Sequence, residues 1–196
     1  MSIFGTVQVK NDKYKIKGDF HHITPNMPIR NADEGWKLMG VTNPREMIYI
    51  HAYGGEAPFF EALGQGKLLA TRCDNPDCEL KGTVYQPFRI HCIECLGRNT
   101  IIDLTEIAKK TAKVHTFMVC ERAGAFNVLD KPIKFINIEF DGVATILMSY
   151  LSMGEPEIGM PVVPIFRKIN PTYTILDLSW VPRETAESDL PEGFCF

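Results

Sequence analysis

The chain has 196 residues, of which 45% are hydrophobic, so it can bury a sizeable core in one domain or in one domain plus a small metal-bound module. A net charge of -3 and an isoelectric point near 6.0 argue against a general nucleic-acid-binding protein, which normally carries a basic excess where it meets phosphate. The start of the chain lacks the basic and apolar parts of a signal peptide, and the longest apolar run, Val143 to Met148, is far too short to cross a membrane, so we expect a cytoplasmic protein.

Residues 1–45 are predicted to form an extended N-terminal arm. From Phe4 to Phe20 apolar and polar residues alternate loosely around a central turn, a pattern typical of a hairpin or an extended arm. The segment from His21 to Gly40 holds two prolines and a single aromatic anchor, Trp36. It has too little apolar content for a core of its own, which favours a stretch lying along another surface.

Residues 46–100 are predicted to hold a short helix and a metal-bound ribbon. Apolar residues between Glu56 and Leu63 fall on one helical face, and Gly64 and Gly66 follow, where glycines commonly end a helix. Leu68 to Thr71 then leads into the first cysteine turn, and a short ribbon strand is expected between the cysteine pairs, at Thr83-Val84-Tyr85 and Phe88. The apolar residues of the helical face are Phe59, Phe60 and Leu63.

Four cysteines in two closely spaced pairs dominate this part of the chain. Cys73 and Cys78 have four residues between them, thirteen residues follow, and Cys92 and Cys95 have two between them. Two such pairs can close a tetrahedron around one Zn²⁺, and four thiolates leave no open position for catalysis, so a structural zinc ribbon with one zinc per chain is predicted. Two disulfides or four unrelated buried cysteines are the less favoured alternatives, because nothing indicates secretion.

Cationic residues flank the second cysteine pair. Arg89, His91 and Arg98 lie within a few residues of it. They can be a solvated rim that balances the negative charge of four thiolates around zinc, which is the favoured interpretation, or a patch that binds a phosphate group.

Residues 101–182 are predicted to form a small β-barrel. Ile133 to Phe140 alternates, Asp141-Gly142 is a strong hairpin signal, and Val143 to Leu151 runs back. Several short strands with turn residues between them favour a closed barrel of OB type, which removes sheet edges. Residues 183–196 are acidic and are expected to form a C-terminal tail with an aromatic tip. Further strands are expected at Thr100–Leu104, Val114–Cys120, Val162–Phe166 and Tyr173–Val181.

One segment, Asp103 to Thr111, is ambiguous. Asp103 with Glu106 three residues later imitates a helical capping box, whereas the segments on either side are rich in β-formers. The local pattern taken alone indicates a helix.

A set of short motifs between about residues 56 and 170 is specific as a set, although each motif alone is weak. The motifs are Ala57-Pro58-Phe59-Phe60-Glu61-Ala62-Leu63, Gly66-Lys67-Leu68-Leu69, Arg72-Cys73, Pro87-Phe88-Arg89, Cys92-Ile93-Glu94-Cys95, Ala112-Lys113-Val114-His115-Thr116-Phe117, Pro132-Ile133, Phe140-Asp141-Gly142 and Ile158-Gly159-Met160-Pro161-Val162. Together they resemble the thiolase-associated family that joins a rubredoxin-like zinc ribbon to an OB fold. The wide first cysteine pair and the long arm depart from the family pattern, but all four ligands are kept.

The resemblance implies a fold and a partner. It implies a mainly β protein with a rubredoxin-like zinc ribbon before a small OB-type barrel, and it implies a strand where Asp103 to Thr111 had been ambiguous. Family members are small partners of thiolase-superfamily and related acyl-CoA enzymes, where they assemble the complex and sit near bound coenzyme A. We therefore expect a hetero-oligomer, two plus two, with a thiolase-family catalytic subunit. The residues expected to contact coenzyme A or acyl-CoA phosphates are Lys67, Arg72, Arg89 and Arg98.

No catalytic residue is assigned in the chain itself. A thiolase needs a nucleophilic cysteine with a histidine and a second cysteine as base, yet four cysteines are committed to zinc, Cys120 is expected to pack in a strand, and Cys195 is expected to be simply exposed. The first hypothesis is thus a non-catalytic subunit of a thiolase-type acyltransferase. The second is a hydratase or aldolase that acts on acyl-CoA, with candidates that are more simply solvated positions. These candidates are His115, Asp130, Glu139 and Asp141.

A single-strand nucleic-acid-binding module is the third hypothesis, since OB folds and zinc ribbons both serve that purpose. Phe117, Phe126 and Phe135 could stack on bases. Their spacing makes them more typical of a core, and the acidic balance of the chain also counts against this hypothesis, so nucleic acid is not an expected partner.

Overall fold

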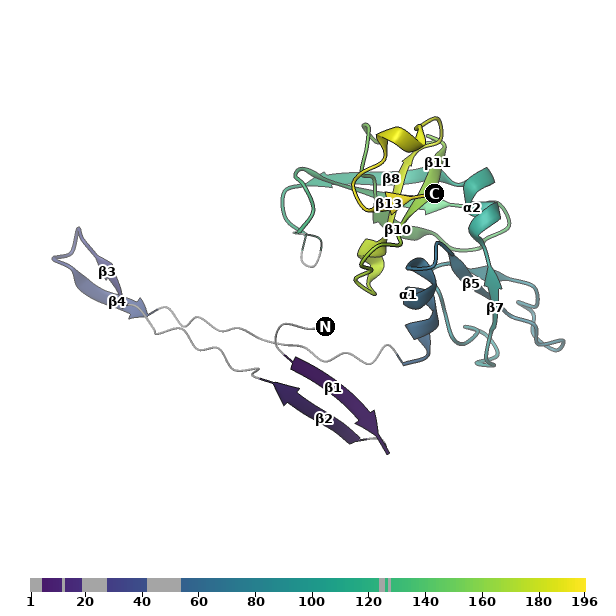
Figure 1. Ribbon diagram of the computed structural model, residues 1–196, viewed down its shortest axis with the longest axis horizontal. Helices are drawn as coiled ribbons and strands as arrows, with labels where there is room; N and C mark the ends of the chain where they lie inside the picture. Colours follow the sequence, from purple (N-terminus) through teal and green to yellow (C-terminus); the bar gives the residue numbers. More distant parts are fainter. Residues whose placement is uncertain (1–4, 12, 19–27, 42–53, 124–125, 127) are drawn as a thin grey trace. The chain divides into compact units, whose positions relative to one another are not determined.

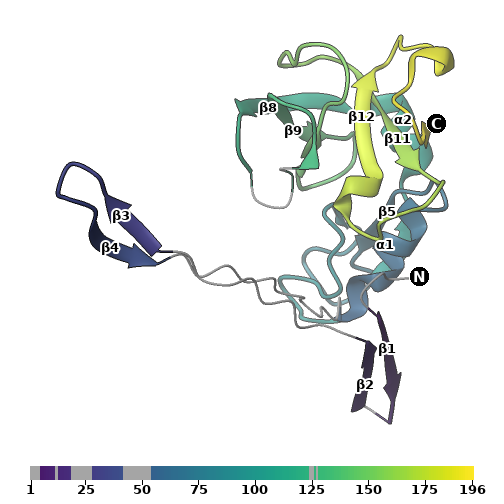
Figure 2. The same cartoon turned by 60° about the vertical axis from the view of Figure 1, so that its left-hand side comes forward.

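The computed structural model describes residues 5–11, 13–18, 28–41, 54–123, 126 and 128–196. The chain divides into two compact units, Met1–Ala52 and Tyr53–Phe196, and each is described by itself. The predicted fold class is confirmed: the protein is mainly β, with a cysteine ribbon followed by a small barrel and two short helices (Figures 1 and 2).

The first unit contains two hairpins. Strand β1 (Gly5–Lys10) pairs antiparallel with β2 (Lys13–Gly18), and Asn11 in the turn has a φ of 52°, a conformation that asparagine tolerates well. This hairpin was one of the two predicted forms of the arm. The second hairpin, β3 (Pro28–Asn31) with β4 (Lys37–Val41), was not predicted. Trp36 precedes β4 and is 66% exposed, so it remains available as an anchor.

The second unit begins with the predicted helix. A short 3₁₀ turn, η1 (Gly54–Glu56), leads into α1 (Ala57–Leu63), whose proline lies in the first turn, where its missing N–H costs nothing. Phe59 and Leu63 are buried. The helix ends as expected, because Gly66 adopts a φ of 77° and lets the N–H of Lys67 reach the carbonyl of Ala62 at 3.0 Å.

The ribbon is a three-stranded sheet in the order β6-β5-β7. Its strands are β5 (Leu69–Arg72), β6 (Val84–Tyr85) and β7 (Thr100–Asp103), all antiparallel. The short strand predicted between the cysteine pairs is therefore confirmed as β6.

The strand expected from family resemblance for the ambiguous segment is wrong. Residues Thr105–Thr111 form helix α2. The carboxylate of Asp103 accepts hydrogen bonds from the N–H and the hydroxyl of Thr105, at 2.9 and 2.6 Å, which helps to start the helix. Leu104, Ala108 and Ala112 are spaced four residues apart and are all fully buried, which is the burial period of a helix. The local sequence signal was right.

The barrel has five strands in the order β8-β9-β10-β12-β11. Antiparallel ladders join β8 to β9, β9 to β10, and β11 to β12. A parallel bridge from Leu151 to Trp180 links β10 to β12, and an antiparallel bridge from Lys113 to Pro161 links β11 back to the start of β8. This is the topology of an OB-type barrel. The strands are β8 (Lys113–Cys120), β9 (Ile133–Glu139), β10 (Leu147–Tyr150), β11 (Val162–Arg167) and β12 (Leu178–Pro182).

Ribbon and barrel share one core. The predicted hairpin of β9 and β10 exists, but β10 begins only at Leu147, because Val143 bridges to Val84 of the ribbon instead. Next to this bridge, the hydroxyl of Thr145 accepts from the N–H of Gln86 and donates to its carbonyl, at 2.8 and 2.9 Å. A single cluster of buried apolar side chains runs from α1 and β5 into the barrel. The domain boundaries predicted from sequence remain a prediction.

The last residues fold back onto the barrel. Strand β13 (Phe194–Cys195) pairs with β11, and Phe194 and Phe196 pack against an apolar cluster on the outer side of β11. Cys195 is half-buried rather than simply exposed, and its sulfur lies 3.7 Å from the carbonyl oxygen of Phe166, so the expectation for Cys195 is wrong. No helix in the described residues is long and apolar enough to span a bilayer.

Candidate metal centre

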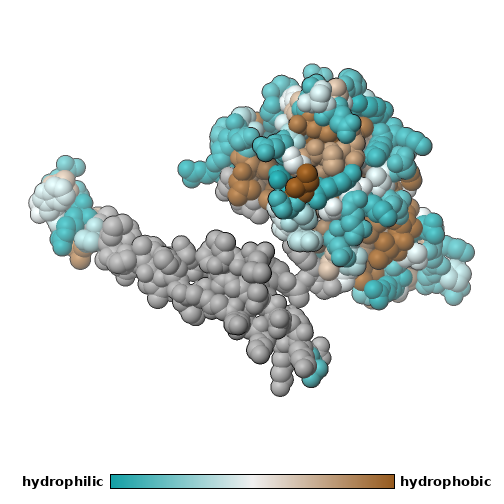
Figure 3. All heavy atoms as spheres, in the orientation of Figure 1, coloured by the Kyte–Doolittle hydropathy of each residue, from teal (hydrophilic) through white to brown (hydrophobic). Residues whose placement is uncertain are grey.

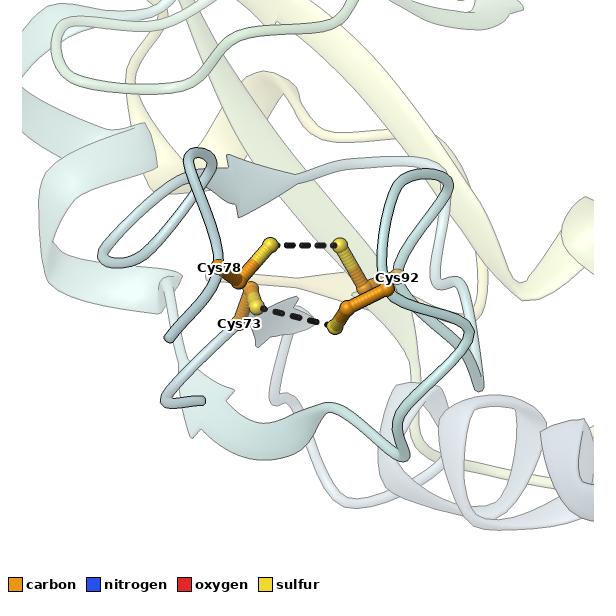
Figure 4. A group of neighbouring side chains, drawn as sticks. Cys73, Cys78 and Cys92 are labelled. Carbon is orange, nitrogen blue, oxygen red and sulfur yellow. Dashed lines mark hydrogen bonds between the residues drawn. The ribbon is translucent and has the colours of Figure 1, made fainter. Parts of the chain in front are cut away.

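The ribbon brings the four predicted cysteines together. Cys73 follows β5 directly, Cys78 ends the turn that starts there, and Cys92 and Cys95 lie on a second turn (Figure 4). Their four Sγ atoms all lie within 4.8 Å of one another. The Sγ atoms of Cys73 and Cys95 are 3.9 Å apart, and those of Cys78 and Cys92 are 3.8 Å apart.

These distances match a tetrahedral zinc site. Zinc–sulfur bonds of about 2.3 Å at tetrahedral angles place neighbouring sulfurs about 3.8 Å apart. Sulfurs bonded as disulfides would instead lie about 2 Å apart, and the four cysteines are free. The donor set therefore fits one Zn²⁺ held by four thiolates, a set that fills every tetrahedral position.

Backbone hydrogen bonds shape both turns around the sulfurs. In the first, the carbonyl of Asn75 accepts from the N–H of Cys78 at 3.2 Å, and the N–H of Asp77 donates to the Asn75 side chain at 3.1 Å. The widened pair therefore encloses a turn that the side chain of Asn75 helps to close. In the second, the N–H of Cys92 donates to the carbonyl of Gly97 at 2.9 Å.

The surroundings shift the pKa values of the two cysteine pairs in opposite directions. The N–H groups of Cys95 and Glu94 lower the pKa of the Cys92 thiol to about 6, and the side chain of Asn75 followed by the N–H of Gly97 lowers the pKa of the Cys95 thiol. The N–H of Asn75 also acts to lower the pKa of Cys73, but burial and the neighbouring thiols outweigh it and raise that pKa to about 12. Burial likewise raises the pKa of the Cys78 thiol. Four thiolates in this space therefore call for a cation to balance them.

Tyr85 of β6 completes the surroundings of the cluster. Its hydroxyl lies 3.8 Å from the Cys92 sulfur, and burial, followed by the hydrogen bond to Cys92, raises the pKa of Tyr85 to about 12. The guanidinium of Arg89 lies over the Tyr85 ring, 5.8 Å from its centre.

The four predicted coenzyme A contacts are not equivalent. Arg72 is engaged: its Nε lies 2.7 Å from the carboxylate of Asp74, whose hydrogen bond raises the pKa of the arginine. Arg89 and Arg98 are exposed and flank the second cysteine turn, where Arg89 also borders a cleft of about 410 Å³ with Glu56 and His91. Lys67 is exposed but precedes β5, at the opposite end of that strand from the cysteines.

Two of the alternative catalytic candidates meet on the barrel. A β-bulge in β8 leaves His115 as an extra residue, and its Nδ1 lies 2.7 Å from a carboxylate oxygen of Glu139 on β9. Lys113 pairs with the other oxygen of Glu139 at 3.0 Å, and these contacts, Lys113 first, lower the pKa of Glu139. All three side chains are at least 35% exposed. Asp130 lies away from them and lines a different cleft, of about 470 Å³.

The aromatic candidates for base stacking are divided. Phe135 is buried, and Phe126 packs edge-on against it with ring centres 4.9 Å apart. Phe117 is 43% exposed, so the expectation that it is a core residue is wrong. Nothing brings the three rings onto one open surface.

The similarity of this chain to a known protein lies in its fold. No family model and no curated protein matches the chain. A solved structure named Ltp2-ChsH2(DUF35) aldolase is 22% identical, with a TM-score of 0.52 over 68% of this chain and 98% of that one. A DUF35-family protein of unknown function from Sulfolobus solfataricus is 19% identical, with a TM-score of 0.48 over 68% and 89% of the two chains. About two thirds of this chain thus shares the fold of nearly the whole chain in the aldolase structure.

Proposed function

We propose that this chain is a non-catalytic, zinc-binding subunit of a thiolase-type acyl-CoA acyltransferase complex. The observation that carries the proposal is the closed four-cysteine cluster in a ribbon whose strands share a buried core with an OB-type barrel. A structure with this fold bears a name that joins two components in an aldolase, which supports a role inside an enzyme complex. The complex would cleave a β-keto acyl-CoA with free coenzyme A, and the catalytic residues would be on the partner.

The metal would be structural. Zinc bound by Cys73, Cys78, Cys92 and Cys95 would contribute folding free energy and fix the two turns of the ribbon. The sulfurs themselves are oriented by backbone N–H groups, such as that of Leu80 toward Cys78 at 3.4 Å and that of Glu94 toward Cys92 at 3.5 Å. These contacts support a fixed site rather than a reactive one.

The other cysteines support a partner-borne chemistry. Cys120 is the last residue of β8 and Cys195 lies in β13, and both are half-buried. A reactive thiolate needs a helix N-terminus, a nearby histidine or another cation, and within the described residues no hydrogen bond joins Cys120 or Cys195 to a histidine or a cationic side chain.

The finer assignment follows from the arm, ribbon and C-terminal segment taken together. They resemble the small subunit of the thiolase that converts benzoylsuccinyl-CoA to benzoyl-CoA and succinyl-CoA in anaerobic toluene breakdown. We propose this substrate, a cytoplasmic location and a two-plus-two assembly with the catalytic thiolase subunit.

The experiment for this proposal is purification of the tagged chain from its native host. A co-eluting thiolase-family protein, identified by mass, together with thiolysis of benzoylsuccinyl-CoA in the eluate, is the expected result. Co-elution of an acyl-CoA hydratase with hydration activity and no thiolysis would contradict it.

A hydratase or aldolase activity of the chain itself is the alternative. The contact of His115 with Glu139 at 2.7 Å favours it, since a histidine oriented by a carboxylate is a common general base. Replacement His115→Ala would then abolish turnover while assembly is preserved.

Charge reversal tests the coenzyme A contact. The double replacement Arg89→Glu with Arg98→Glu should raise the apparent KM of the complex for coenzyme A by on the order of a hundredfold, because each guanidinium would donate charge-assisted hydrogen bonds worth about 1.5 kcal/mol to a phosphate, and every 1.4 kcal/mol is about tenfold. Lys81→Glu, an exposed charge in the same ribbon, is the control. An unchanged KM in an intact complex would show that these arginines form a solvated rim and do not bind coenzyme A.

A further inference from the structure

The barrel has an open edge along most of β8. In the described residues, the segment that leads into β11 meets β8 at the start of β8, where the N–H of Val114 donates to the carbonyl of Met160 at 3.0 Å and the N–H of Gly159 donates to the carbonyl of Val114 at 2.7 Å. Beyond that point, the described residues provide no strand on this side of Thr116 to Cys120. A closed barrel would normally leave no such edge.

The register shows which backbone groups face outward. The carbonyl of Lys134 on β9 accepts from the N–H of Leu151, so this residue faces β10. Because neighbouring residues of a strand face opposite edges, Phe135 faces β8, where it pairs with Met118. The N–H and C=O groups of Phe117 and Val119, on either side of Met118, therefore point away from β9 to the open edge.

The side chains along this edge are apolar and exposed on both faces of the strand. Phe117 and Val119 are 43% and 46% exposed, and on the other face Met118 is 57% exposed and Met148 of β10 is 52% exposed. Figure 3 shows hydrophobic atoms at the surface over the end of the barrel toward which β8 runs. From Thr116 to Cys120 there is neither a proline nor a charged residue such as lysine, which commonly protect free edges.

We propose that the edge of β8 from Thr116 to Cys120 receives an extended, apolar segment of the acyl-CoA enzyme subunit as an added strand. This inference rests on the proposed function, which supplies the partner. An extended strand satisfies the outward amides of Phe117 and Val119 and covers apolar side chains on both faces, as a helix or loop cannot.

The size of the patch favours this partner over a second copy of the chain. The exposed side chains offer on the order of 400 Å² per molecule, about half of what each partner contributes to a stable interface of standard size. Two copies joined here alone would bury no more than a weak crystal contact does. This limit on buried area does not apply to a strand from the enzyme subunit, when other parts of this chain also bind that subunit.

Hydrogen exchange of the purified complex and of the isolated chain is the primary test. Peptides covering residues 115–121 should exchange at least tenfold more slowly in the complex with the co-purified acyl-CoA enzyme, because the outward amides gain partners. Unchanged exchange in an intact complex would overturn the inference and leave the proposed function standing. Slow exchange in a self-associated isolated chain, or fast exchange only after deletion of residues 1–45, would overturn it in favour of a second copy or the chain's own arm.

Edge variants supply the second measurement. Val119→Pro removes an outward N–H without touching the β9 ladder, and Val119→Lys adds a charge that strand pairing would bury. Both should weaken assembly at least tenfold, while the matched Val128→Lys, at an exposed valine outside the strands, should not. Assembly of folded Val119→Lys at wild-type strength would overturn the inference. Absence of any acyl-CoA enzyme from the purified material would overturn the proposed function and this inference together.

Discussion

Replacement Cys92→Ser should leave the ribbon unfolded or insoluble. Zinc bound to a four-cysteine site contributes on the order of 10 kcal/mol to folding, as much as the whole stability of a typical domain. Because ribbon and barrel share one buried core, the loss should also lower the melting temperature of the barrel. The measurement is zinc content by elemental analysis together with a thermal melt.

Cys120→Ser is the matched control for that experiment. It changes a half-buried cysteine of the same unit that lies outside the cluster, so zinc content should stay at one equivalent per chain. Less than half an equivalent of zinc in the native protein, or a Cys92→Ser protein that melts like wild type, would contradict the structural-zinc assignment.

Deletion of residues 1–45 should weaken assembly with the partner by tenfold or more while zinc content is kept. Isolated two-stranded hairpins are marginal at best in water, so β1 with β2 and β3 with β4 need a surface to pack against. The exposed Trp36 beside β4 is an aromatic anchor of the kind that dominates interface energies.

Co-purification and a binding titration of the deleted chain measure this effect. Trp36→Ala in the full chain is the milder variant and should account for part of the loss. A deleted chain that binds its partner as tightly as the full chain would show that the arm has another role.

The metal cluster was predictable because its signal is local. Two pairs of cysteines on turns need only short-range geometry, and Asn75 within the widened pair closes its turn with its own side chain. Helix α2 also has a local sequence signal, which consists of Asp103 and the buried positions Leu104 and Ala108. The error came from preferring a family pattern to that signal.

Two sets of short strands have too little local pattern to be predicted. The hairpin of β3 and β4 has four- and five-residue strands and a bulge after Ile29, which leave little alternation to detect. Strand β13 has two residues and exists only because β11 offers it an edge.

The side-chain arrangement of the barrel surface was not predictable, because it depends on pairing between distant segments of the chain. His115 meets Glu139 across a ladder with a bulge, and the open edge at Phe117 depends on where β11 leaves β8. Neither relation has a signature in a single segment of sequence.

The central claim, that this chain supports an acyl-CoA enzyme without performing its chemistry, is tested most directly by assaying thiolysis with the separate chains and with their mixture. We expect no turnover by this chain alone, turnover by the mixture, and nearly unchanged turnover when Cys120 and Cys195 are both replaced by alanine. Turnover by this chain alone, or its loss in the mixture on Cys120→Ala or His115→Ala with assembly preserved, would contradict the account and place the active site in this protein.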